Sequence, residues 1–437
     1  MYPLIIELQD RHLALRNREG LLKRSPGVIS VASGQPVFGD DALAQSHLHP
    51  QLSYNHFWTQ LGMDPLPVKN KHFRHTADMA YAHLQSLVHE HKPVDGAVIA
   101  VPPSYTRAQL AILLGLIKQC DFAAVGLVDH ALLLAAAGSE ADTIVIDLQL
   151  HQAVLSRHVR MDGHLVRDRV VQVPFAGLLA LRDAWLNLIA GEFVRQSRFD
   201  PQRNAEAEQY LADQLPRWLA AIAQSQDLML EINLKGTVHQ AMVTREQFEQ
   251  RSQPVFARIN AELAQLRHPE SVLHIATSQV GLPGLTRAIP GLVALDDELV
   301  AESCYLYLDA IRRPADGLQF ISKLPVTNTP AKVTTALQAK TPTHVLVQHK
   351  AHALPPGRLG IGKLPAGVEC ARLLPVGSAA DGFSLLRTPR GVQLELHNAA
   401  TVWCNGKPAV DGQFLVAGDS VQFAAAVELQ LIIVEAA

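Results

Sequence analysis

The segment from Ala97 to Leu148 constrains the fold of this chain more than any other. Apolar runs typical of strands alternate in it with runs typical of helices, and the helical runs are apolar too. Strands are expected at 98–101, 123–128 and 143–148, with helices at 108–117 and 131–137. Apolar residues on both kinds of element indicate a parallel sheet that is covered on both faces. We therefore expect the core of an α/β domain here.

The flanking segments extend this pattern. Strands are predicted at 4–8, 12–16 and 28–32, and again at 153–161, 165–173, 228–232, 239–243 and 272–275. Asp162-Gly163 stands between two of these strands, and Asp-Gly at such a position favours a tight hairpin turn. Helices are predicted at 72–91, 177–194, 206–223, 245–266 and 296–310.

Composition excludes several classes of protein. The 437 residues are enough for two to four domains, and 48% hydrophobic with 18% charged residues is typical of a globular chain. A formal net charge of −3 gives no argument for nucleic acid or an anionic membrane. The four cysteines lack C-x-x-C spacing, which fits a reducing compartment. With no membrane-length apolar run and no basic leader, a cytoplasmic location is expected.

The C-terminal part has a different composition. Residues 321–343 are rich in Thr, Pro and Lys and are expected to be a linker. From 344 to 437, short alternating segments are separated by Gly and Pro turns, which predicts a small β-sandwich. Gly357–Lys363 has the glycine spacing of a phosphate loop, but Leu364 follows where Ser or Thr would hold Mg²⁺. A glycine-rich turn of the β-domain is the favoured interpretation.

Two further groups of residues invite a chemical interpretation. His72, His75, His83, His89 and His91 cluster in one expected helix. Because no Cys or carboxylate completes a ligand set, solvated or capping histidines are favoured over a metal site. Ser104 and Thr106 follow a strand, but without a G-x-S-x-G elbow a helix-capping role is favoured over a nucleophile.

Three acidic residues stand at the ends of expected strands: Glu7, Asp129 and Asp147. In an open α/β sheet, ligands bind beyond the carboxyl ends of the strands, and carboxylates there could hold Mg²⁺ through water. The alternative is that they are ordinary acidic residues near strand ends.

The order of the segments resembles the ATPase domain of the DnaK-type heat-shock chaperones, in the actin and sugar-kinase superfamily. The resemblance is carried by VIAVPPSYTRAQL, by VGLVDHALLLAAA with Asp129 at an acidic position, and by TIVIDL with the hairpin after it. VFGDDALAQSHLHP and VLHIATSQVGLPGLTRAI are also similar to family segments. It covers about residues 3–312. It implies a duplicated fold with two lobes around a cleft, lobe I at about 1–140 and lobe II at about 141–320, within a degenerate ATPase domain of residues 1–320.

The chain departs from this family where ATP would bind. The family's first phosphate loop, Asp-Leu-Gly-Thr-Thr, is here Glu7-Leu8-Gln9-Asp10-Arg11. In the second, Gln149-Leu150-His151 replaces the glycines that let backbone N–H groups approach phosphate. The adenosine-binding segment keeps Thr277 and Ser278 as equivalents but lacks its glycine pair, and the catalytic lysine falls near Trp58.

The C-terminal module resembles a forkhead-associated β-sandwich through VWCNGKPAVDGQFLVAGDSVQF. Asn405 and Lys363 are the interaction candidates that this resemblance implies. No Ser-x-x-His loop is present, so recognition of phosphopeptides does not follow.

Two hypotheses result. In the first, the chain is a non-catalytic chaperone-like or actin-like interaction or scaffold protein, a pseudo-ATPase that binds a protein partner and needs no cofactor. In the alternative, it is a divergent, weak ATPase that holds Mg-ATP with Asp147, Glu7 and Asp129 and regulates a partner through domain closure. A sugar or acyl kinase would need the same missing phosphate loops.

Overall fold

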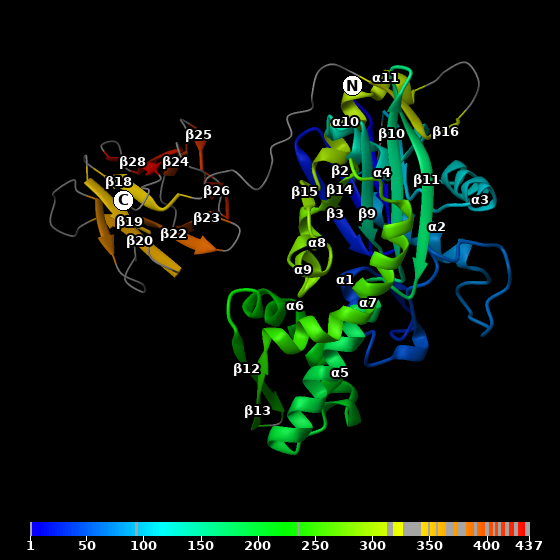
Figure 1. Cartoon of the computed structure of the whole chain (residues 1–437). Coiled ribbons are helices and arrows are strands. Elements are labelled where there is room, and N and C mark those ends of the chain that lie inside the picture. The colour runs from blue at the N-terminus through cyan, green and yellow to red at the C-terminus, as the bar shows by residue number, and fades with distance from the viewer. Residues whose placement is uncertain are drawn as a thin grey trace. The chain divides into compact units, whose positions relative to one another are not determined.

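The computed structural model forms two units, Met1–Val333 and Thr334–Ala437, which are described separately (Figure 1). In the first unit it describes residues 2–91, 95–234, 236–312 and 318–326. In the second it describes residues 342–347, 350–354, 357–363, 371–374, 382–388, 391–397, 402–404, 407–409, 412–415, 419–423 and 427–432.

The first sheet of the N-terminal unit has the strand order β16-β8-β7-β1-β2-β3. β1, β2 and β3 form an antiparallel meander, while β7, β8 and β16 run parallel to β1. The bounds are β1 Leu4–Leu8, β2 His12–Asn17, β3 Gly20–Pro26, β7 Ala97–Val101, β8 Ala124–Asp129 and β16 Phe320–Ile321.

The second sheet repeats this arrangement in the order β15-β14-β9-β10-β11-β17. β9, β10 and β11 form the meander, and β14 and β15 run parallel to β9. The bounds are β9 Asp142–Leu148, β10 Gln152–Met161, β11 His164–Pro174, β14 Val272–Ala276, β15 Leu292–Leu295 and β17 Lys323–Pro325. Five strands of each sheet thus share one order and one set of directions, and the N-terminal unit has two topologically equivalent lobes.

Helices and small strands fill the connections. The helices are α1 Asp40–Leu43, α2 Thr76–Val88, α3 Arg107–Lys118, α4 His130–Ala137, α5 Leu178–Ser197, α6 Ala205–Ile222, α7 Arg245–Leu266, α8 Thr277–Val280, α9 Leu285–Ala288, α10 Leu299–Leu306 and α11 Leu308–Ile311. Short 3₁₀ turns lie at Pro50–Leu52 and Pro201–Arg203. Lobe II carries a hairpin of β12 Asp227–Leu234 and β13 Thr237–Thr244, and lobe I a small sheet of β4 Ile29–Ser30, β5 Val37–Phe38 and β6 Ser53–Tyr54.

The apolar run of helix α4 follows from its position in the interior. All eight of its residues are buried, and it shares one apolar cluster with α10, the helix that follows β15 in the other lobe. A helix that is apolar on all sides belongs in such an interior. Asp129 begins it, because its carboxylate accepts hydrogen bonds from the N–H groups of Ala131 and Leu132.

Two predictions about local structure in the N-terminal unit were wrong. The third strand of the first meander is β3, Gly20–Pro26, and only Ile29–Ser30 of the expected strand 28–32 pairs, in the separate small sheet. β3 is an edge strand that carries Lys23 and Arg24 and buries only Ser25, so it lacks the alternation that predicts strands. The helix expected at 296–310 is divided at Tyr307 into α10 and α11.

The segment 318–326 joins the two sheets. β16 pairs with β8 in the first sheet, and β17, which begins two residues after β16 ends, pairs with β11 in the second. The first residues of the segment expected to be a linker are therefore part of the two sheets, Ile321 of the first and Lys323–Pro325 of the second.

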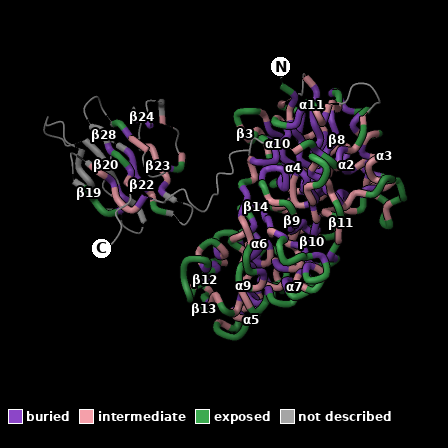
Figure 2. The backbone as a smooth tube through the Cα atoms, turned by 45° about the horizontal axis from the view of Figure 1, so that its top comes forward, coloured by how far each residue is buried: buried purple, intermediate pink, exposed green. Residues whose placement is uncertain are grey.

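The C-terminal unit consists of two antiparallel sheets, β19-β18-β28-β27-β24-β25 and β21-β20-β22-β23-β26. Their bounds are β18 His344–Val347, β19 Lys350–Ala353, β20 Gly357–Lys363, β21 Ala371–Leu374, β22 Gly382–Thr388, β23 Gly391–His397, β24 Val402–Cys404, β25 Lys407–Pro408, β26 Phe414–Leu415, β27 Ser420–Phe423 and β28 Val427–Ile432. Apolar residues of both sheets belong to one core cluster. Figure 2 colours the buried residues purple along the backbone.

The phosphate-loop-like glycine spacing forms strand β20 rather than the expected turn. Asn405 lies outside the described residues, and of Lys363 only the backbone, at the end of β20, is described.

Candidate functional site

Two equivalent hairpin turns meet at the centre of the N-terminal unit. Gln9-Asp10-Arg11 joins β1 to β2, and Gln149-Leu150-His151 joins β9 to β10. Asp10 Oδ1 accepts a hydrogen bond from the N–H of Leu150 at 2.7 Å, and Oδ2 accepts one from the N–H of His151 at 3.2 Å. We call these two contacts the Asp10 bridge. It places a carboxylate of lobe I on the backbone donors of the second turn, in lobe II.

The carboxylate of Asp10 is enclosed. It is 4% exposed, and Thr59 donates its hydroxyl hydrogen to Oδ2 at 2.9 Å. Burial raises the pKa of Asp10, although the hydrogen bonds from Leu150 and Thr59 act in the opposite direction. Consecutive backbone N–H groups in a turn form a concavity that binds anions. In this chain the anion is an internal side chain.

Each turn is supported from behind by a glycine. Gly27 lies just beyond β3 and Gly177 just beyond β11, so the two occupy equivalent places in the lobes. A Cβ atom at Gly27 would lie 1.9 Å from the carbonyl oxygen of Asp10. One at Gly177 would lie 2.5 Å from both the nitrogen of Gln152 and the carbonyl oxygen of Leu150. These close approaches fix the positions of both turns.

A second contact joins the lobes beside the Asp10 bridge. The rings of His56 and His151 stack with centroids 3.7 Å apart and an interplanar angle of 20°. His151 Nε2 donates a hydrogen bond to the carbonyl oxygen of Asn55 at 3.0 Å. Burial lowers the pKa of His56, and the charge of His151 lowers it further. The second turn is thereby held to lobe I on two sides.

Glu7, the first metal candidate, belongs to a buried ion-pair network. It accepts a hydrogen bond from Arg16, whose guanidinium also pairs with Glu298 before α10. The side chain of Arg16 is only 1% exposed. Although burial alone would raise it, the nearby His130 and Arg16 hold the pKa of Glu7 below its ordinary value. These partners give Glu7 a structural role in joining β1, β2 and α10.

Asp129 and Asp147 have separate partners. Asp129, the N-cap of α4, pairs with Arg167 of β11 at 2.7 Å, and burial raises the pKa of Asp129 more than this arginine lowers it. Asp147 accepts a hydrogen bond from Gln149 Nε2 at 3.0 Å. Within the described part of the chain, no group of three or more His, Cys, Asp or Glu side chains is placed to hold a metal ion. The three acidic candidates are therefore not assembled into one metal-binding group.

The adenosine-segment equivalents are also engaged within the protein. Thr277 donates to the carbonyl oxygen of Leu295 at 2.9 Å, and Ser278 donates to Asp297 at 3.2 Å. No sequence pattern indicated the part played by Gln279. Its buried amide donates to the carbonyl oxygen of Leu148 at 2.8 Å and accepts from the N–H of Leu148 at 3.2 Å. Gln279 thus packs against the end of β9.

Trp58, near the expected position of the catalytic lysine, is part of the lobe I core. Its indole N–H donates to His83 Nδ1 at 3.0 Å, and His83 Nε2 donates to the hydroxyl of Ser25 at 2.7 Å. Burial lowers the pKa of His83 to about 3, so the ring is neutral near pH 7. His83, from the expected histidine cluster, is therefore a satisfied core residue.

The space left beside the Asp10 bridge is small. A cavity of about 90 Å³ remains, lined by residues that include Asp10, Thr59, Tyr105, Gln149 and Gln152. Pockets that enclose drug-sized ligands are typically about 300–1,000 Å³.

Thr106, which lines the cavity, is the N-cap of α3. Its hydroxyl accepts a hydrogen bond from the N–H of Gln109, which confirms the predicted capping role.

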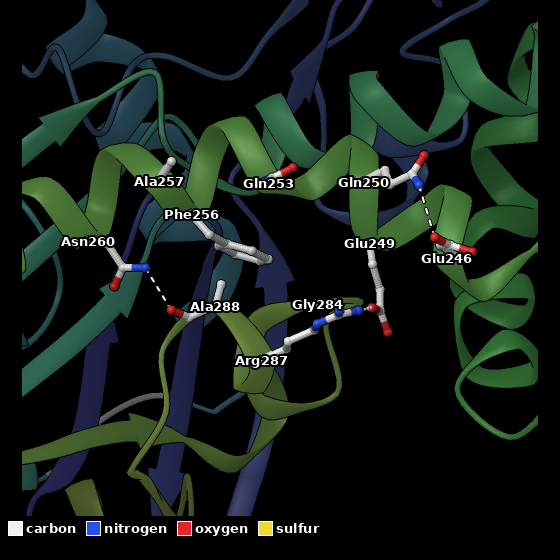
Figure 3. Close-up of a pocket in the computed structure, with 10 residues that line it drawn as sticks. All are labelled: Glu246, Glu249, Gln250, Gln253, Phe256, Ala257, Asn260, Gly284, Arg287 and Ala288. Atoms are coloured by element: carbon white, nitrogen blue, oxygen red, sulfur yellow. Dashed lines mark hydrogen bonds and ion pairs between the residues drawn. The ribbon is translucent and has the colours of Figure 1, made fainter.

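A larger hollow of about 450 Å³ lies elsewhere in lobe II, between α7 and α9 (Figure 3). Several polar side chains around it are bonded to one another or to the backbone. Glu249 pairs with Arg287 at 3.2 Å, and Asn260 donates to the carbonyl oxygen of Ala288 at 2.7 Å.

Asp10 was the residue that sequence reasoning did not select. The available signal was an acidic side chain at a turn position where the family that the sequence resembles has a hydroxyl residue after glycine.

No model of a known protein family matches the chain, and no curated protein matches it. None of the helices in the described residues has the length and apolar character that a membrane crossing requires.

Proposed function

We propose that this chain is a non-catalytic interaction or scaffold protein, built on a duplicated actin-like fold of the chaperone ATPase type. The observation that carries the proposal is the Asp10 bridge, which occupies the backbone donors that a phosphate would use. A protein partner, rather than a nucleotide, is then the ligand of the N-terminal unit.

The physical argument concerns charge and space. A nucleotide phosphate could reach the N–H groups of Leu150 and His151 only by displacing Asp10 from them. The released carboxylate would remain next to the phosphate, and like charges at such short distances repel strongly. The remaining cavity of about 90 Å³ is several times smaller than a typical ligand pocket. Both effects oppose nucleotide binding.

The repeated strand order of the two sheets supports the actin-like part of the proposal. So does the packing of α4 against α10, the two helices that follow the fifth strand of each repeat. The C-terminal unit, with its two antiparallel sheets, serves in this proposal as a second recognition surface of forkhead-associated type. The expected site of action is the cytoplasm.

One observation favours the alternative of a weak ATPase. Asp147 lies at the end of β9 and, within the described residues, forms no ion pair with a cationic side chain. It could orient a hydrated Mg²⁺ if the lobes opened and released the Asp10 bridge.

Thermal unfolding in the presence of millimolar Mg-ATP or Mg-ADP separates the two functions. A ligand at one hundred times its Kd stabilises the native state by about 2.7 kcal/mol, which would raise Tm by several degrees. We expect no shift and no heat of binding by isothermal titration. A saturable shift that disappears in Asp147→Ala would overturn the scaffold proposal and support the ATPase.

A further inference from the structure

Phe175 combines two features that rarely occur together. Its side chain is 75% exposed, and its backbone has a φ of 57°, in the left-handed region. Bulky side chains are uncommon at positive φ, where Gly and Asn are preferred. Neither burial nor backbone preference explains an aromatic residue at this position.

The backbone conformation itself has a structural cause. After β11 the chain turns so that the N–H of Phe175 donates to the carbonyl oxygen of His151 at 3.1 Å. Two residues further on, Gly177 packs against the second hairpin turn. The turn requires a positive φ, but it does not require a phenyl ring. The ring is therefore available for a contact outside the chain.

Arg258 of α7 lies beside this ring. The guanidinium carbon of Arg258 lies 5.9 Å from the centroid of the Phe175 ring, and its Nη1 donates to the carbonyl oxygen of Phe175 at 3.4 Å. Arg251 lies seven residues earlier, on the same face of the helix. Both arginines are exposed, and neither forms an ion pair within the described part of the chain. The acidic residue nearest to Arg258 along α7 is Glu262, one turn beyond it.

We propose that Phe175, Arg251 and Arg258 form a docking surface for an acidic protein segment that carries an apolar side chain. The inference rests on the proposed interaction function and locates its surface. Aromatic and arginine side chains dominate binding energy at protein interfaces, and two unpaired arginines favour an acidic partner through charge complementarity.

The surface is coupled to the Asp10 bridge through one residue. His151 accepts the hydrogen bond from Phe175 with its carbonyl oxygen and donates its own N–H to Asp10. A partner bound at Phe175 would thus be separated from the Asp10 bridge by this one residue of the second turn.

Titration of the full chain with a random copolymer of glutamate and tyrosine tests this surface. Polyglutamate and a copolymer of lysine and tyrosine are the control ligands. We expect the glutamate–tyrosine copolymer to bind about tenfold more tightly than polyglutamate, the loss typical of removing one aromatic anchor. The lysine–tyrosine copolymer should not bind. Binding should weaken as salt increases, and this salt dependence should decrease in the double variant Arg251→Gln/Arg258→Gln.

Phe175→Gly and Phe175→Asn separate docking from folding. Both residues accept the positive φ, so urea unfolding should remain at the wild-type midpoint while affinity for the copolymer falls about tenfold. Val68→Asn, at an apolar side chain that is 71% exposed, is the matched control and should bind normally. Equal binding by wild type and Phe175→Gly, equal binding of polyglutamate, or no binding of the copolymer would overturn the inference. Nucleotide binding would instead overturn the proposed function, whatever the copolymer does.

Discussion

The two lobes of the N-terminal unit share the order of five strands, but their first hairpin turns have opposite roles in hydrogen bonding. In each lobe the first strand ends with an acidic residue and a leucine, and the turn begins with glutamine: Glu7-Leu8-Gln9 and Asp147-Leu148-Gln149. The next position differs, because the first turn has Asp10 and the second has Leu150. One turn therefore provides the acceptor and the other provides the donors. The two topologically equivalent turns are therefore chemically complementary.

The lobes differ more widely between their third and fourth strands. In this connection, the described part of lobe I has three short strands and the helices α1 and α2. Lobe II has α5, α6, the β12–β13 hairpin and α7 in the same place. The aromatic side chains of Trp185, Phe193, Phe248 and Phe256 join this insertion to the core of the second sheet. The surface proposed for docking belongs to lobe II, and the carboxylate of the Asp10 bridge belongs to lobe I.

Gly27 and Gly177 support the hairpin turns in the same way in both lobes. Replacing them should lower the free energy of unfolding more than any other substitution considered below. Gly27→Ala and Gly177→Ala would each place a Cβ atom within 2.5 Å of backbone atoms of the hairpin turns. Because backbone cannot move aside as a flexible side chain does, we expect each to cost about 3 kcal/mol or more in urea unfolding. Gly27→Ala should be the more severe, since its Cβ atom would lie 1.9 Å from the nearest backbone oxygen.

Each lobe offers a control glycine. A Cβ atom added at Gly115 in α3 or at Gly191 in α5 would meet no neighbouring heavy atom within 4 Å. Alanine at these exposed helical positions should stabilise the protein by about 0.5–1 kcal/mol. If Gly27→Ala and Gly177→Ala unfold at the same urea concentration as these controls, the turns are not fixed as described.

Much of the fold could be predicted from local pattern. The apolar run of α4, the Asp162-Gly163 turn and the helix Arg245–Leu266 all follow from periodicity and turn chemistry. β3 could not, because an edge strand buries too little to impose alternation. The Asp10 bridge joins residues 140 positions apart, and no local pattern specifies such a pair. The missing glycines predicted that the second turn would not admit a phosphate, but only the three-dimensional arrangement shows that Asp10 occupies its N–H groups.

Buried histidines provide the next comparison between the lobes. His83 in lobe I and His158 in lobe II both have a pKa lowered by burial from 6.5 to about 3. Between these values the unfolded chain binds the proton and the folded chain does not. Stability should therefore be complete above pH 6.5 and fall on acidification, by about 2 kcal/mol per histidine at pH 5. Urea unfolding at pH 7.5 and pH 5 measures this loss.

Replacing one histidine at a time sharpens the comparison. His83→Gln and His158→Gln should each remove about half of the acid-induced loss. They should differ at pH 7.5, because both ring nitrogens of His83 are hydrogen-bonded, whereas Nδ1 of His158 has no hydrogen-bond partner among the residues that the structure describes. His83→Gln should therefore be the more destabilising. An unchanged acid-induced loss in both variants would show that other groups cause it.

The smallest effect on stability is expected from the Asp10 bridge itself. Asp10→Ala removes the acceptor for Leu150 and His151, but it also removes a carboxylate whose burial is unfavourable, as its raised pKa indicates. The two contributions partly cancel, and we expect a net loss of about 1 kcal/mol in unfolding free energy. The same substitution should also change hydrogen exchange at the N–H groups that bond to Asp10. Exchange at the N–H groups of Leu150 and His151 should accelerate by about fivefold or more, since 1.4 kcal/mol corresponds to about tenfold in an equilibrium. Thr59→Val keeps the bridging carboxylate and should leave this exchange nearly unchanged. Equal exchange in Asp10→Ala and wild type would mean that the two turns do not hold the lobes together. The proposal that Asp10 occupies the phosphate-binding donors would then lose its support.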